Sequence, residues 1–249
     1  MTARTLKGKE PGILMVLNET RYATIEQVNG IVGTPTEVKY IGKLLDRLYR
    51  ESYVQIRKRR NDERKVYFLW TRGKHWLIDQ GLATPEELKK TAGVKGGLEH
   101  PIPHDLSLTD IFVHTYKQAC ELGYSFTWLN TRQVKLLYPY YSVEPDAWMS
   151  LGGSETTIEA FCEFTDDVYS ASIMRQKLGH YGDLWRDTKP LPILWFTTSL
   201  AKRRKLAMMI KDFAYKDYVY LGLMEDVGKY LKQGVFLWQG KEKQRWLNA

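Results

Sequence analysis

The sequence predicts an α/β protein, α+β overall, that consists of two domains. An amphipathic basic helix and a hairpin pattern occupy residues 36–70, and strand and helix patterns alternate in the second half of the chain. Glycine and proline accumulate between these two regions. A chain of 249 residues with 43% hydrophobic residues can bury a sizeable core. We therefore expect an N-terminal domain in residues 1–82, a linker in residues 83–104 and a second domain in residues 105–249.

Two short helices are expected before the basic helix. Residues 10–18 are the first, with Pro11 in the first turn, where proline is tolerated because its missing N–H has no intrahelical partner. Thr24 precedes a second short helix, and Gln27 stands where a capping box requires a glutamine or glutamate. Gly33 then leads into a turn.

The basic helix begins near Thr36, and apolar residues recur in it at helical spacing with basic residues between them. From residue 54 to residue 70, β-branched and aromatic residues flank a polar turn at Asn61-Asp62. Short helix, turn, basic helix and hairpin follow one another in the order of a winged helix-turn-helix domain. The alternative is a solvated charged hairpin on an ordinary domain.

A winged helix would place one face of its recognition helix in the major groove and its hairpin, the wing, on neighbouring phosphates of duplex DNA. The expected contact residues on the helix are Thr36, Lys39, Tyr40, Lys43 and Arg47, and those of the wing are Arg57, Lys58, Arg59, Arg60 and Arg64.

The charge distribution also favours a polyanionic partner. Residues 1–80 contain 16 Lys and Arg against 9 Asp and Glu, so nearly the whole net charge of +8 lies in the N-terminal part. Such an asymmetry attracts nucleic acid through counterion release, without implying any sequence preference.

The second half is expected to form a mixed sheet with helices on both faces. The run 191–198 is continuously apolar, as in a strand buried on both faces. The expected strands are 125–129, 147–151, 157–164, 191–198 and 218–223, and the expected helices are 108–122, 170–186 and 200–213.

Three motifs in this half resemble the core of PD-(D/E)xK nucleases. Pro145-Asp146 opens one strand, the next strand carries Glu163, and the following helix carries Lys177 and Tyr181. With the winged helix before it, the chain resembles the replication-relaxation family of plasmids, phages and integrative elements over residues 10–240. The resemblance implies a restriction-endonuclease-like second domain in which Asp146 and Glu163 hold a divalent metal, with Mg²⁺ as the expected ion.

The chain departs from the nuclease motif at Thr165, where the motif has the lysine that activates the attacking water. Lys177 is the candidate to replace that lysine from the helix. Since a catalytic part is missing, we expect a nuclease-like domain used for binding or dimerisation, with no cofactor. The alternative is an Mg²⁺-dependent endonuclease or nickase with Asp146, Glu163 and Lys177 as catalytic residues. Non-catalytic interpretations are a turn residue for Asp146 and an ion-paired strand residue for Glu163.

Two further segments have open interpretations. The basic run 202–205 starts a helix and either contacts phosphate or is a solvated face. Asp166 and Asp167 either join the acidic pair or cap the next helix. The tail around Trp246 combines an aromatic with basic residues, as in a platform on which bases stack.

The expected function is that of a DNA-binding protein of a mobile element, acting in replication, conjugative transfer or transcriptional control. Double-stranded DNA is the expected partner, and a further alternative is an adaptor that recruits a relaxase or a replication initiator. A homodimer is one expected state. No apolar run is long enough for a membrane helix, and two cysteines suggest a reducing, cytoplasmic compartment.

Overall fold

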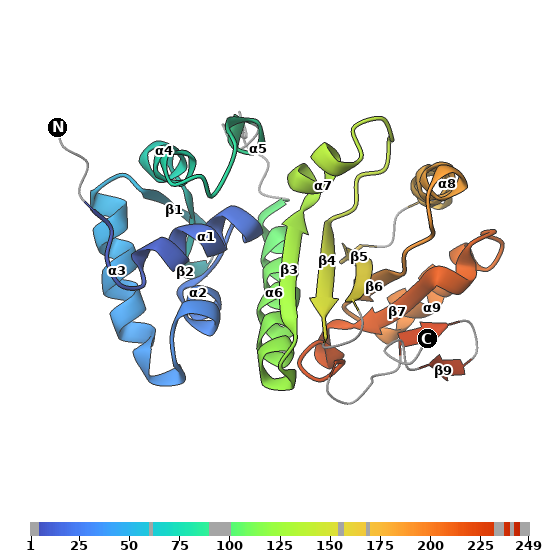
Figure 1. Ribbon diagram of the computed structural model, residues 1–249. Helices are drawn as coiled ribbons and strands as arrows, with labels where there is room; N and C mark the ends of the chain where they lie inside the picture. The colour runs from blue at the N-terminus through green and yellow to red at the C-terminus, as the bar shows by residue number, and fades with distance from the viewer. Residues whose placement is uncertain are drawn as a thin grey trace. The chain divides into compact units, whose positions relative to one another are not determined.

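The computed structural model describes residues 5–59, 62–89, 101–153, 157–167, 170–231, 237–239 and 242–244. The chain divides into two compact units, Met1–Val113 and His114–Ala249. The boundary falls within helix α6 (Pro101–Leu122), and Figure 1 shows the elements of the chain with their labels.

The first unit has the order of elements that the sequence predicts, with helices before a hairpin. Three α-helices and one short 3-10 helix precede a two-stranded antiparallel hairpin, and a bridge between Ala23 and Tyr67 adds the chain before the second α-helix to the hairpin edge. The elements are α1 (Glu10–Thr20), α2 (Ile25–Val32), η1 (Pro35–Glu37), α3 (Val38–Arg50), β1 (Val54–Arg59), β2 (Asp62–Leu69), α4 (Thr71–Asp79) and α5 (Pro85–Lys89).

Local sequence signals explain these elements. Thr24 and Gln27 form the expected capping box at the start of α2. In α3 the apolar residues Ile41, Leu44, Leu45 and Leu48 are buried. Because these side chains recur at helical spacing, their burial turns the basic residues of α3 outward.

Part of the segment 83–104, which the sequence predicts to be a linker, is helical in the structure. Helix α6 (Pro101–Leu122) begins inside it, with Pro101 and Pro103 in the first turn, where proline costs no hydrogen bond. Polar contacts attach the first half of α6 to the preceding elements of the first unit: the Thr109 hydroxyl donates to the Tyr22 carbonyl at 2.7 Å. The first unit therefore extends to Val113 and not to residue 82. Residues 90–100 lie outside the described part of the chain.

The second unit is built on a mixed sheet with the strand order β3-β4-β5-β6-β7-β8-β9. Its elements after α6 are β3 (Ser125–Asn130), α7 (Thr131–Leu137), β4 (Ala147–Gly152), β5 (Thr157–Thr165), α8 (Ala171–Asp187), β6 (Ile193–Thr197), α9 (Leu200–Ile210), η2 (Lys216–Tyr218), β7 (Val219–Leu223), η3 (Met224–Asp226), β8 (Leu237–Gln239) and β9 (Glu242–Gln244).

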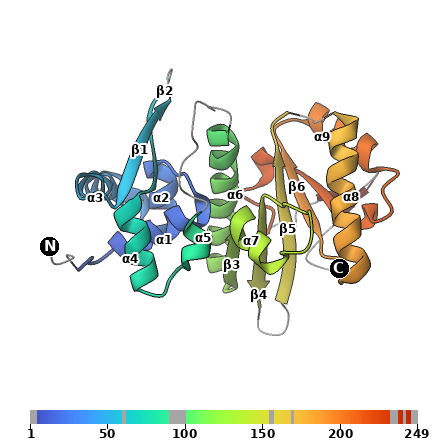
Figure 2. The same cartoon turned by 90° about the horizontal axis from the view of Figure 1, so that it is seen from above.

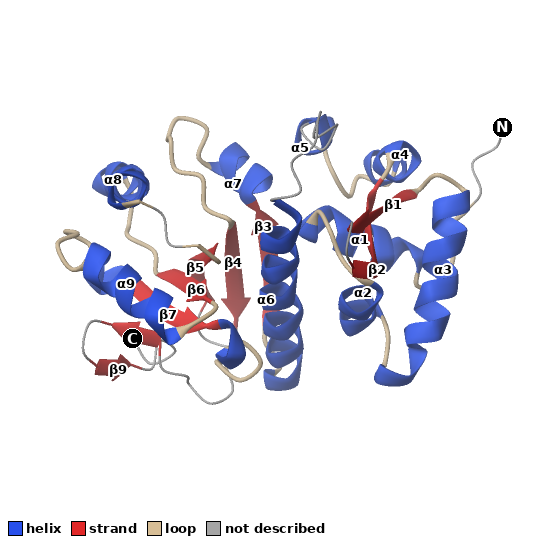
Figure 3. Ribbon diagram, turned by 180° about the vertical axis from the view of Figure 1, so that it is seen from behind, coloured by secondary structure: helices blue, strands red, loops and turns tan. Residues whose placement is uncertain are grey.

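Strand direction changes across this sheet. Strands β3, β4 and β5 form an antiparallel meander, whereas β5, β6 and β7 are parallel. Helices α8 and α9 make the two parallel crossovers and cover the same face (Figures 2 and 3). The expected mixed α/β fold is therefore present. In the C-terminal tail, β8 and β9 extend the sheet beyond β7, which the sequence did not predict, and Trp246 lies outside the described residues.

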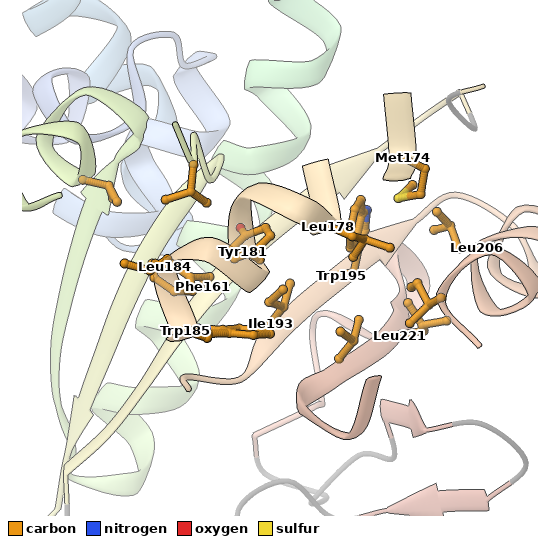
Figure 4. Close-up of a cluster of buried hydrophobic side chains, with 14 residues drawn as sticks. Phe161, Met174, Leu178, Tyr181, Leu184, Trp185, Ile193, Trp195, Leu206 and Leu221 are labelled. Carbon is orange, nitrogen blue, oxygen red and sulfur yellow. The ribbon is translucent and has the colours of Figure 1, made fainter. Parts of the chain in front are cut away.

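The main core of this unit lies between the sheet and α8 and α9. Every residue of β6 is buried, as the continuous apolar run predicts. Alternate strand residues such as Phe161, Ile193 and Trp195 meet Leu178 and Tyr181 of α8 (Figure 4). On the opposite face, the Thr115 hydroxyl of α6 is 2.8 Å from that of Tyr230. Within the described part of the chain, no helix is long and apolar enough to cross a membrane.

Gly73 limits the packing of α4 against the hairpin. A Cβ atom at this position would lie 2.2 Å from the Tyr53 carbonyl oxygen, which already accepts a hydrogen bond from the Trp70 N–H at 3.0 Å. We expect Gly73→Ala to lower the free energy of unfolding by about 2 kcal/mol, because α4 must move.

Gly42 in α3 is the matched position with free space: a Cβ atom added there would lie 3.8 Å from its nearest neighbour. Gly42→Ala should instead stabilise the protein by up to about 1 kcal/mol. Urea denaturation of the two variants checks both signs.

Candidate functional site

The exposed face of α3 carries most of the residues expected at a DNA interface. Lys39 and Lys43 are exposed and lie one helical turn apart, and Tyr40 beside them is 48% exposed. Thr36 is also exposed, in the turn η1 before the helix. Within the described residues, neither Lys39 nor Lys43 meets a carboxylate. This face therefore offers two ammonium groups and a phenol to a ligand from solvent.

Arg47 differs from its neighbours on this face. Its Nη2 donates to the Glu10 carboxylate at 2.6 Å, and that carboxylate is fully buried at the start of α1. Arg47 is therefore an internal ion-pair partner as well as a surface residue, with 41% of its side chain exposed. The sequence pattern places Arg47 on the α3 face but contains no sign of this pairing.

Part of the expected wing is described. Arg57 on β1 is half-buried and Arg64 on β2 is exposed. Lys65 on β2 reaches back to Asp46 of α3, with 3.3 Å between Nζ and Oδ1, so helix and wing are joined by an ion pair. The side chains of Lys58, Arg59 and Arg60 lie outside the described part of the structure.

In the second unit, the fold brings together the acidic residues that resemble a nuclease motif. Asp146 immediately precedes β4, and its carbonyl oxygen accepts hydrogen bonds from the backbone N–H and the hydroxyl of Thr131. Its Oδ2 accepts a hydrogen bond from the Phe164 N–H of β5 at 2.8 Å. Since Ala147 pairs with Cys162, Asp146 comes next to Glu163 across the two strands. Asp146 and Glu163 thus lie next to each other on adjacent chain segments, as expected.

Glu163 is fully buried, and protein donors engage both of its carboxylate oxygens. Oε1 accepts a hydrogen bond from the Tyr181 hydroxyl at 2.6 Å, and Oε2 is paired with the Lys177 ammonium. Lys177 and Tyr181 are four residues apart on α8 and so lie on one face of the helix. Burial raises the pKa of Glu163 to about 8; the Asp146 charge adds to this rise, and Lys177 and Tyr181 oppose it.

Lys177 reaches the Glu163 carboxylate from α8. A residue that replaces the lysine missing at position 165 would have to make such a contact. The Lys177 side chain is 19% exposed, and its Nζ lies 5.6 Å from the centre of the Trp195 ring. Thr165 occupies the motif's lysine position, and its hydroxyl accepts a hydrogen bond from Trp195 Nε1 at 2.9 Å. Position 165 therefore serves packing in this chain.

These residues do not fit a resident Mg²⁺ in the arrangement observed. The ion requires about six oxygen ligands, several of them water, and Glu163 has no exposed surface and no oxygen without a donor. Among the described residues, no three His, Cys, Asp or Glu side chains converge on one point. Asp166 turns away to Lys202 of α9, at 3.1 Å, while Ser170 caps α8. The structure thus answers the question about Asp166, which neither joins the acidic pair nor caps that helix.

Comparison with known proteins adds little to this geometry. No family model matches the chain, and no curated protein does. The solved structure of the restriction endonuclease FokI has a TM-score of 0.31 and 14% sequence identity to it. The alignment covers 94% of this chain and 47% of the FokI chain, so this chain spans less than half of that length. A likeness of this degree supports no statement about activity.

The raised pKa of Glu163 predicts a pH dependence of stability. Between the ordinary value of 4.5 and about 8, the folded protein holds a proton that the unfolded chain has lost. The free energy of unfolding should therefore fall as pH rises through this window, with a slope on the order of 1 kcal/mol per pH unit from this group. Glu163→Gln mimics the protonated acid and should remove this contribution in urea denaturation at pH 5, 6, 7 and 8.

Glu159→Gln is the matched control, because Glu159 is exposed on the same strand. It should keep the wild-type slope. A wild-type slope in Glu163→Gln as well would show that Glu163 is charged in the folded protein across this range.

Proposed function

We propose that this chain is a DNA-binding protein that docks on duplex DNA through α3 and the β1–β2 wing. The observation that carries the proposal is the exposed basic face of α3, opposite a fully apolar buried face and beside a hairpin joined to it through Asp46 and Lys65. A helix of this kind fits the major groove, and lysines on its face neutralise phosphates.

The second unit, in this proposal, is a nuclease-like scaffold that serves binding or dimerisation and not cleavage. Its support is the internal satisfaction of Glu163 by Lys177 and Tyr181, which leaves this carboxylate no ligand position for a metal. The resemblance to the replication-relaxation family extends the proposal to a role on a plasmid, phage or integrative element. Replication, conjugative transfer or control of its transcription would each use such a protein.

Removal of the two exposed α3 lysines tests the interface. We expect Lys39→Ala/Lys43→Ala to weaken binding to a mixed-sequence duplex roughly tenfold at moderate salt. It should also reduce the slope of log Kd against log salt by about two, because two phosphate contacts are lost. Fluorescence anisotropy with a labelled duplex over a KCl series measures both quantities.

The control variant Lys117→Ala/Lys189→Ala removes the same charge from exposed positions of the second unit and should bind like the wild type. Equal weakening in both variants would mean that charge alone, and not the α3 face, determines binding. Little salt-dependent affinity in the wild type would instead favour an adaptor that recruits a relaxase or a replication initiator.

The second candidate function, Mg²⁺-dependent cleavage, is favoured by one observation: Lys177 reaches Glu163 from α8. The proposal predicts that supercoiled and linear DNA stay intact with Mg²⁺ under conditions where the protein binds. Nicking that requires Mg²⁺ and disappears in Asp146→Ala would contradict the scaffold role. It would make Asp146, Glu163 and Lys177 catalytic residues.

A further inference from the structure

The start of α1 holds the basic helix at two points. Lys9 pairs with Glu37, directly before α3, with 2.7 Å between Nζ and Oε2. Glu10, the next residue, accepts a hydrogen bond from Arg47 near the end of α3 at 2.6 Å. Glu37 also accepts the Thr34 N–H at 2.7 Å, and both donors hold the pKa of Glu37 below its usual range. Lys9, directly before α1, and Glu10, its first residue, thus contact the two ends of α3.

The surroundings of the Glu10 carboxylate hold it in a fixed position beside Arg47. It is fully buried, and its second oxygen accepts a hydrogen bond from the Lys7 N–H at 3.0 Å. A buried carboxylate is costly unless donors satisfy it, so its orientation is tightly determined. The guanidinium bound to it is consequently held in one place.

Arg47 is only partly used by this contact. Its Nη2 donates to Glu10, and its Nε is buried without a partner among the described residues. Nη1 is left as the nitrogen that can reach a ligand from solvent, on a side chain that is 41% exposed. Arg47 lies one turn beyond Lys43 on the basic face, so a ligand along Lys39 and Lys43 would meet it.

We propose that Glu10 is a positioning residue for DNA binding, and that it aims the Arg47 guanidinium at a phosphate of the duplex. This inference rests on the proposed function. An unrestrained arginine loses side-chain entropy when it binds, whereas one already fixed by a carboxylate has lost it on folding. The ion pair also keeps the guanidinium charged and fixes the direction of Nη1, which can then donate a charge-assisted hydrogen bond to a phosphate oxygen.

A purely structural ion pair makes a different prediction. Glu10→Gln removes one negative charge and raises the net charge from +8 by one, so general electrostatics would tighten binding to DNA. Positioning predicts the opposite, because glutamine offers Arg47 only a neutral acceptor. The direction of the change in affinity therefore separates the two roles.

The experiment measures Kd for a labelled mixed-sequence duplex over a KCl series with the full chain. The variants are Glu10→Gln, Arg47→Ala, Arg47→Lys and the double variant Glu10→Gln/Arg47→Ala. Leu77→Ala in α4 is a control for lost stability, since Leu77 is buried but lies off the basic face. Thermal melts set a temperature at which every variant is folded.

We expect Glu10→Gln and Arg47→Ala each to weaken binding roughly five- to tenfold, the loss of about one charge-assisted contact. The double variant should be no weaker than Arg47→Ala alone, because Glu10 acts through Arg47. Arg47→Lys keeps the charge but not the fork, and should also weaken binding. Leu77→Ala should bind like the wild type.

Unchanged or tighter binding by Glu10→Gln, with salt-dependent binding intact in the wild type, would overturn the positioning role alone. Additive losses in the double variant would overturn it too. If Glu10→Gln does not fold, wild-type affinity in Arg47→Lys would be evidence against an aimed guanidinium. Absence of salt-dependent binding by the wild type would overturn the proposed function and this inference together.

Discussion

A carboxylate removed from water must be satisfied by the protein, and each unit of this chain is organised around one such group. Glu10 and Glu163 are both fully buried, and each is paired with a cation from a neighbouring helix, Arg47 of α3 or Lys177 of α8. Removal of the basic partner would leave each buried glutamate without one of its donors, which destabilises the folded protein. The pairs therefore determine how α3 packs on α1 and how α8 packs on β5.

The two pairs have different consequences for chemistry. Arg47 keeps an exposed portion, so the first pair combines a structural contact with a donor that can meet a ligand. In the second pair the Tyr181 hydroxyl and the Lys177 ammonium use both oxygens of Glu163. The same residues that resemble a nuclease motif thus form a closed network between sheet and helix. Its internal hydrogen bonds stabilise the core and leave no open ligand position on Glu163.

The elements that the sequence predicted well are those with a strong local period. The apolar repeat of α3 and the continuous apolar run of β6 identify their elements, because burial of one face or of both leaves a regular trace in the sequence. The predictions fail where they depend on the amino-acid composition of a segment and ignore the position of each residue in it. Pro101 falls in the predicted linker, yet it begins α6, because proline is compatible with a first helical turn. Helix α7 was missed, although Asn130 and Gln133 form a readable capping box at its start.

The amino-acid pattern alone is enough to predict that a basic, amphipathic helix precedes a hairpin, and that Asp146 and Glu163 belong to two consecutive strands of the chain. Periodicity and strand order carry that information because they are local. The pairing of Arg47 with Glu10 and of Lys177 with Glu163 is visible only in the folded chain. Residues 37 positions apart, in the first pair, leave no periodic signal. Their pairing follows from the low polarity of the core, in which a charge must find a partner that folding has brought within reach.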